Sequence, residues 1–174
     1  MLRLLLLRHA KAIPYAGRDD YERTLTERGR ADAQMAAAYI ARQTPGPDLL
    51  IHSGAARTKE TAEIVLRGLP PGIEISIEPE IYEAGRASLL QLVRDLPDDS
   101  PNVLIVGHNP GMADLARLLA GRGEAGAGAK MSVKFPTSGL AVIEFPTHAW
   151  KRASPGGGNL IAFVTPATLG GEDA

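Results

Sequence analysis

Short apolar runs alternate with helix-like stretches along this chain, and that alternation limits its fold more than any other feature. Three runs are nearly continuous, as strands covered on both faces are, and they occupy residues 2–7, 48–52 and 102–107. Between the runs, apolar residues recur at helical spacing, for example at positions 89, 92, 93 and 96. Apolar strands separated by helices predict a layered α/β domain, with a mostly parallel central sheet and helices on both of its faces.

The remaining segments complete a single domain over residues 1–169, with residues 170–174 as a flexible tail. Further helices and strands are expected at residues 26–42, 55–67, 73–78, 88–96, 112–119, 140–145 and 160–164. Thr26 and Ser88 are placed to cap two of the helices. The glycine- and alanine-rich residues 121–129 predict a flexible loop.

The chain contains no cysteine, which excludes disulfides, thiolate metal sites and a cysteine nucleophile. Because it has no need of an oxidising compartment, we expect it in the cytosol. Its 19 basic and 20 acidic residues leave a formal net charge of −1, which does not favour binding to nucleic acid or to an anionic membrane. The apolar run near the N-terminus is too short for a secretion signal, which needs about 7–15 apolar residues.

Histidines and arginines stand where the three predicted strands end. Arg8 and His9 follow the first run, Ser53 and Arg57 follow the second, and His108 follows the third. The carboxyl ends of neighbouring parallel strands meet at one edge of a sheet, so we expect these residues to lie together. Paired arginines match phosphate geometry, and a histidine between them should have a lowered pKa and a free lone pair. With no metal-ligand spacing among the histidines, the pattern predicts a phosphoryl-transfer site that needs no metal or other cofactor.

Other residues bear on the same edge. A helix that begins near Pro110 is expected to add backbone donors and a favourable dipole. Ser53 is a candidate to bond the phosphate, with capping of the following helix as the alternative. Asp19, Asp20 and Glu22 form an acidic patch after the first strand, which we interpret as a solvated loop rather than a metal site.

Three segments of the chain carry a family resemblance. They read LLLLRHAKA from Leu4, HSGAARTKETAEIV from His52 and VLIVGHNPGM from Val103. Together they resemble the histidine phosphatase superfamily, which contains phosphoglycerate mutases and acid phosphatases. The match is closest to short bacterial phosphohistidine phosphatases of the SixA type, which KFPTSGLAVIEF from Lys134 and IYEAG from Ile81 also resemble. The resemblance implies a three-layer, phosphoglycerate mutase-like fold.

The resemblance also implies a role for each matching residue. His9 is similar to the family nucleophile, which becomes phosphohistidine during turnover. Arg8 and Arg57 match the phosphate-binding arginines, and His108 matches the second histidine, which contacts the phosphoryl group. Glu83 is similar to the acidic proton donor of larger members, and a group on the substrate is the alternative donor.

One position departs from the commonest signature of the superfamily. Ala10 follows His9, where that signature has glycine. Alanine does not readily adopt a positive φ, so we expect an ordinary backbone conformation there.

The sequence thus predicts a metal-independent phosphatase that hydrolyses phosphohistidine on proteins through a phosphorylated His9. A small-molecule phosphomonoesterase and a non-catalytic phosphate-recognition module are the alternatives. The 50 residues between Arg57 and His108 leave no room for a large lid over a small metabolite, which favours a protein carrying phosphohistidine as the partner. We expect a monomer.

Overall fold

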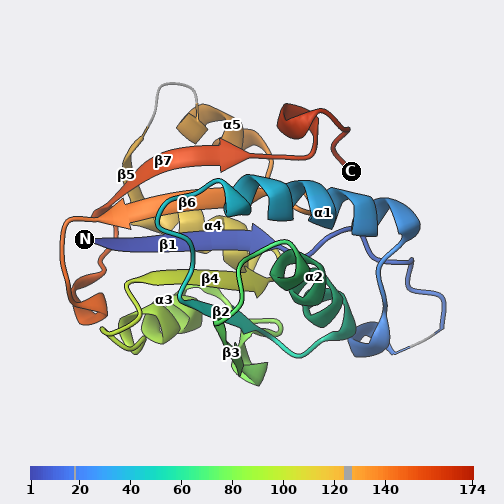
Figure 1. The fold of residues 1–174 in the computed structure, drawn as a ribbon, viewed down its shortest axis with the longest axis horizontal. Coiled ribbons are helices and arrows are strands. Elements are labelled where there is room, and N and C mark those ends of the chain that lie inside the picture. The colour runs from blue at the N-terminus through green and yellow to red at the C-terminus, as the bar shows by residue number, and fades with distance from the viewer. Residues whose placement is uncertain (18, 124–126) are drawn as a thin grey trace.

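The structure is a computed structural model that describes residues 1–17, 19–123 and 127–174. These residues build one seven-stranded sheet in the order β3-β2-β4-β1-β6-β7-β5 (Figure 1). The strands are β1 (Leu2–Arg8), β2 (Leu49–His52), β3 (Glu74–Ile77), β4 (Asn102–Gly107), β5 (Ala120–Gly123), β6 (Leu140–Phe145) and β7 (Gly158–Val164). β1, β2, β3 and β4 run parallel to one another, β5 runs parallel to β7, and β6 is antiparallel to both β1 and β7. The predicted mostly parallel sheet is confirmed.

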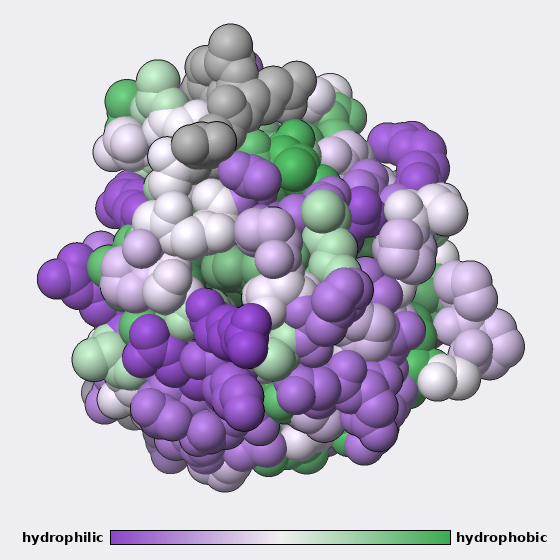
Figure 2. Space-filling model, turned by 90° about the vertical axis from the view of Figure 1, so that its left-hand side faces the viewer, coloured by the Kyte–Doolittle hydropathy of each residue, from purple (hydrophilic) through white to green (hydrophobic). Residues whose placement is uncertain are grey.

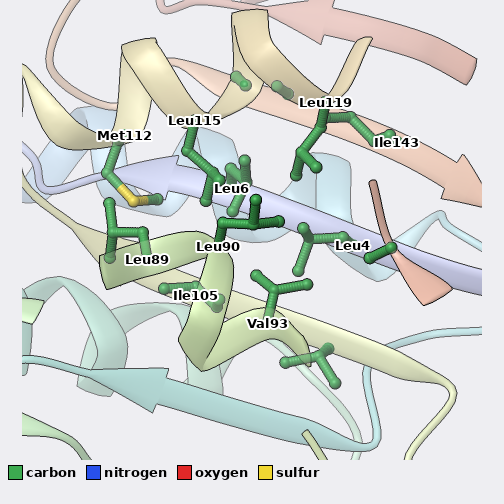
Figure 3. Close-up of a cluster of buried hydrophobic side chains, with 14 of the residues drawn as sticks. Leu4, Leu6, Leu89, Leu90, Val93, Ile105, Met112, Leu115, Leu119 and Ile143 are labelled. Carbon is green, nitrogen blue, oxygen red and sulfur yellow. The ribbon is translucent and has the colours of Figure 1, made fainter. Parts of the chain in front are cut away.

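Helices cover both faces of this sheet, which gives the three predicted layers. They are α1 (Glu27–Ala41), α2 (Ala56–Arg67), α3 (Arg86–Arg94), α4 (Gly111–Leu119) and α5 (Ala127–Val133), with short 3-10 helices η1 (Asp20–Glu22), η2 (Pro79–Ile81), η3 (Trp150–Arg152) and η4 (Ala167–Leu169). Leu5 and Leu7 of β1 pack in one buried cluster with residues of α1 and α2. Leu4 and Leu6 pack on the opposite face with residues of α3 and α4 (Figure 3). Successive strand side chains point to opposite faces, so the leucine run of β1 fills both layers of the core.

The two predicted helix caps have different outcomes. Thr26 caps α1, because its hydroxyl accepts a hydrogen bond from the Gly29 N–H at 2.9 Å. The Ser88 cap is wrong, since α3 begins at Arg86 with Gly85 as its cap residue. Gly85 takes the extended conformation of a cap residue, so the chain enters the helix before it reaches Ser88.

The flexible loop predicted at residues 121–129 is wrong in the part that the structure describes. β5 pairs through its backbone with β7, and α5 follows; residues 124–126 lie outside the described chain. Strand pairing uses backbone groups, which is why a glycine-rich segment can form an edge strand. In the tail, the Gly171 N–H donates to the Pro166 carbonyl at 2.8 Å, and the Asp173 carboxylate accepts from the Ala167 N–H at 2.9 Å.

The carboxyl ends of the parallel strands lie at one end of the molecule, away from the amino end of β1. Figure 2 shows the end that carries the amino end of β1, where hydrophilic residues dominate the lower half and apolar residues are scattered among them. The carboxyl ends of β1, β2 and β4 lie at the other end of the molecule (Figure 1). Among the helices of the described chain, none has the length and apolar character that a membrane span requires.

Candidate active site

The carboxyl ends of adjacent strands bring His9 and His108 together. Arg8 at the end of β1 is in register with Gly107 at the end of β4, and the His9 N–H donates to the Gly107 carbonyl at 3.0 Å. The imidazole centroids of His9 and His108 are 5.4 Å apart. β2 flanks β4 on its other side, and Ser53, which follows β2, has its Oγ 2.7 Å from His108 Nε2.

His9 is a buried, neutral imidazole with a defined tautomer. Its Nδ1 lies 2.7 Å from the Ala10 carbonyl oxygen, which can only accept a hydrogen bond. Nδ1 therefore carries the hydrogen, and Nε2 keeps its lone pair. The pKa of His9 is lowered to about 3, mainly by burial and in smaller part by the charges of His108, Arg57 and Arg8. The lowered pKa agrees with expectation, but burial rather than the arginines is its main cause.

His108 is fixed by a chain of hydroxyl groups. Thr58 Oγ1 donates to the Ala55 carbonyl at 2.9 Å and lies 2.8 Å from Ser53 Oγ. Since the single hydroxyl hydrogen of Thr58 is already used, Ser53 must donate to Thr58 and accept from His108 Nε2–H. In the neutral ring the lone pair is then on Nδ1, a buried atom without a hydrogen-bond partner in the described chain. Burial lowers the pKa of His108 to about 4, with a further contribution from Arg57.

Both predicted arginines reach this site. Arg8 Nη1 donates to the Phe135 carbonyl at 3.1 Å, and Arg57 Nη1 donates to the Asp20 carbonyl at 2.8 Å. The Nε atoms of the two arginines are buried and have no partner among the described residues. Burial lowers the pKa of Arg8, and the charge of Arg57 adds to the effect. Buried donors without a protein acceptor are what a phosphoryl group satisfies.

The backbone around His9 is held by the turn before β6. The Ser138 N–H is shared between the carbonyls of Arg8 at 3.1 Å and His9 at 3.2 Å. Ser138 has a φ of 58°, an uncommon conformation for a residue with a side chain. Ala10, by contrast, is absent from the positive-φ residues of the described chain, so its ordinary backbone is confirmed.

The beginning of α4 supplies fewer backbone donors than expected. The helix starts after Pro110, as expected, but three amides of its first turn are already bonded within the chain. Their acceptors are the carbonyls of His108 and Pro110 and the side-chain oxygen of Asn109. These three amides are therefore already satisfied within the turn and helix, and the contribution of the Gly111 N–H and of the helix dipole stays a prediction.

Asp20 and Tyr82 are site residues that the sequence did not reveal. Asp20 Oδ2 lies 3.1 Å from Arg57 Nη2, and the Tyr82 hydroxyl donates to the same oxygen at 2.5 Å. The Tyr82 ring packs edge-on against the His108 ring, with centroids 5.3 Å apart. The Tyr82 hydrogen bond lowers the pKa of Asp20 to about 2, helped by Arg57 and Arg23. The interpretation of Asp20 as part of a solvated loop is therefore wrong.

Glu83 lies next to Tyr82 but is exposed, with a φ of 61°. No hydrogen bond or ion pair joins it to another residue of the described chain. The structure thus brings together Arg8, His9, Ser53, Arg57 and His108, and leaves Glu83 at the surface nearby. Within the described residues, no group of three or more acidic or histidine side chains is arranged to hold a metal ion.

Comparisons with known proteins identify the family of this chain. The family model of the histidine phosphatase superfamily (branch 1) matches residues 4–92. An uncharacterised protein of Mycobacterium tuberculosis (strain H37Rv) is 30% identical over 162 residues, which cover 92% of this chain and 99% of that protein.

Solved structures resemble the whole domain. A candidate phosphohistidine phosphatase SixA of Agrobacterium tumefaciens is 34% identical with a TM-score of 0.77, over 95% of this chain and 98% of that one. Phosphoglycerate mutase of Plasmodium falciparum, at 15% identity, shares the fold with a TM-score of 0.55 over 94% of this chain and 87% of its own. The phosphoglycerate mutase-like fold is confirmed, and the chain belongs to branch 1 of the histidine phosphatase superfamily.

Proposed function

We propose that this protein hydrolyses phosphohistidine on proteins through a phosphorylated His9. Membership of the histidine phosphatase superfamily supports phosphatase activity in general. The observation that carries the finer proposal is the tautomer of His9, whose Nδ1–H bonds the Ala10 carbonyl at 2.7 Å and leaves the Nε2 lone pair free. A neutral imidazole with a free lone pair, beside two arginines, is equipped to attack phosphorus.

The proposed reaction has two steps. His9 Nε2 attacks the phosphorus atom, a P–N bond to His9 forms, and the P–N bond to the substrate imidazole breaks. The substrate nitrogen leaves with a proton, from the solution or from a nearby acid. Water then attacks phospho-His9, and inorganic phosphate and neutral His9 are released. Arg8 and Arg57 hold the negative charge of the transferring group in both steps.

The substrate nitrogen needs a proton donor as it leaves. Glu83 remains the predicted donor, with a group on the substrate as the alternative. His108 has a different role, which is to stabilise the charge of the phosphoryl group. His108 Nδ1 is buried beside the nucleophile, so a bound phosphoryl dianion would favour protonation of that atom. A protonated Nδ1 can donate to a phosphoryl oxygen while Ser53 accepts from Nε2.

The residues between Arg57 and His108 favour a protein substrate, because they leave no segment free to form a large lid over a small metabolite. They form the rest of α2, then β3, η2, α3 and β4, which belong to the sheet and its covering layer. The similarity to SixA proteins points in the same direction. We also propose that the protein is a monomer, that it acts in the cytosol and that it needs no metal. The lack of cysteine is in keeping with the cytosol.

Rapid-quench labelling tests the proposal. Wild type and His9→Ala are mixed with a phosphorus-32-labelled phosphohistidine protein and quenched in alkali. We expect alkali-stable, acid-labile label on the wild type alone. Binding of the labelled protein with neither transfer nor phosphate release would instead favour a phosphate-recognition module. Faster turnover of small phosphomonoesters than of the phosphoprotein would favour the phosphomonoesterase.

A further inference from the structure

Arg57, a residue proposed to bind phosphate, is already bonded to an anion of its own chain. Its Nη1 donates to the Asp20 carbonyl at 2.8 Å, and its Nη2 lies 3.1 Å from Asp20 Oδ2. Forked bonds from two guanidinium nitrogens are also how arginine holds a phosphate. One residue therefore covers both terminal nitrogens of Arg57 with oxygen acceptors, in the manner of a phosphoryl group.

Asp20 has a second cationic partner that does not depend on Arg57. Arg23 Nε lies 2.9 Å from Asp20 Oδ1, and Arg23 Nη1 is itself anchored on the Ile13 carbonyl at 2.9 Å. The Asp20 side chain is 38% exposed, whereas that of Arg57 is 7% exposed. Asp20 can thus release Arg57 and still keep its ion pair with Arg23 at the surface. The buried guanidinium of Arg57 then needs another acceptor.

We propose that Asp20 is an internal competitor for the phosphate-binding site, and that it selects against free phosphate and small phosphate esters. To reach both terminal nitrogens of Arg57, a small anion must replace Asp20 there, and it gains only the contacts inside the site, such as those with the unpartnered Nε atoms of Arg8 and Arg57. When the phosphoryl group is carried on a protein, that protein can also contact η1, the surface element on which Asp20 lies. These additional contacts offset the free energy lost when Asp20 is displaced from Arg57. This inference rests on the proposed role of Arg57 and names the substrate class that the site favours.

The Asp20 carboxylate stays ionised at neutral pH and in mild acid. The Tyr82 hydrogen bond, together with Arg57 and Arg23, lowers the pKa of Asp20 to about 2, so protonation does not remove its charge. Tyr82 also connects Asp20 with the rest of the site. The centroid of its ring is 5.8 Å from Arg57 Cζ, and the ring packs against His108. Removing the carboxylate charge should therefore strengthen anion binding directly.

The test is the dissociation constant of inorganic phosphate, measured by isothermal titration calorimetry. We expect Asp20→Asn to bind phosphate about tenfold more tightly than wild type, or better. Tyr82→Phe keeps the charge but loses one bond to it, so a smaller gain is expected. Asp19→Asn is the matched control. Asp19 caps η1 by accepting from the Tyr21 N–H, which asparagine also does, so phosphate affinity should not change.

Unchanged or weaker phosphate binding by Asp20→Asn would overturn the proposal and leave Asp20 as a residue that only orients Arg57. If that variant does not fold, as judged by circular dichroism, Tyr82→Phe decides by the same criterion. A second readout is the ratio of kcat/KM for p-nitrophenyl phosphate to that for a phosphohistidine protein, which should rise in Asp20→Asn. Phosphate affinity needs no turnover, so a gain in affinity without labelling of His9 would refute the proposed function alone.

Discussion

Replacing Ser53 by alanine tests the hydroxyl chain behind His108. Ser53 is fully buried, and its Oγ accepts from the Ala55 N–H at 3.2 Å and, by the hydrogen count above, from His108 Nε2–H. Alanine leaves both donors buried without an acceptor. Each such donor costs about 1–3 kcal/mol, so we expect the two together to lower the free energy of unfolding by about 2–6 kcal/mol.

Urea unfolding followed by circular dichroism measures this loss. Ser100→Ala is the matched control, because Ser100 is also buried and its contact to Trp150 Nε1, at 2.9 Å, uses the backbone carbonyl that alanine retains. We expect the control to lose clearly less stability than Ser53→Ala. A loss below about 1 kcal/mol in Ser53→Ala would show that Ser53 does not satisfy those two donors, and the assignment of the lone pair to His108 Nδ1 would fall with it.

His9→Ala should abolish both label and turnover in the rapid-quench assay, and residual turnover at the wild-type rate would exclude His9 as the nucleophile. Arg57→Ala should lower kcat/KM by an amount equal to about 2–4 kcal/mol of transition-state stabilisation, and full activity would remove Arg57 from the site. EDTA should leave turnover unchanged, whereas a clear loss that added metal restores would refute a metal-free reaction. Lowering the pH from 7 to 5 should destabilise wild type by about 2 kcal/mol more than His9→Ala, because His9, with its pKa lowered to about 3, takes up a proton only when unfolded; equal losses in urea unfolding would contradict a buried neutral His9.

The sheet and most of the site were predictable because their signals are local. A continuous apolar run predicts a strand buried on both faces, and the residue after such a strand lies at the edge of the sheet. That reasoning placed Arg8, His9 and His108 correctly from short segments. It could not place β5, whose glycine-rich sequence carries no strand pattern and whose pairing with β7 depends on a distant part of the chain.

Asp20 shows why the rest of the site was missed. Its partners Arg57 and Tyr82 lie 37 and 62 positions away in the sequence, and no periodicity links such residues. An isolated acidic patch is most often solvated, so the sequence favoured the wrong interpretation. Tyr82 lies in the IYEAG segment, in which the acidic Glu83 is the residue that matches a proton donor of the family. Only the tertiary structure shows that the neighbouring aromatic ring faces His108.

The position of β1 has a consequence for how this protein is made. β1 is the first strand to be synthesised, yet its two neighbours in the sheet are β4 and β6, so that Leu5 pairs with Leu104 on one side and Val142 on the other. A nascent chain that ends before β6 leaves one edge of a leucine-rich strand unpaired. His9, which follows β1, therefore reaches its final setting only after β6 (Leu140–Phe145) has left the ribosome. Until then, helices α1 to α4 can already pack on the two faces of β1, but the backbone groups along that edge have no partner strand.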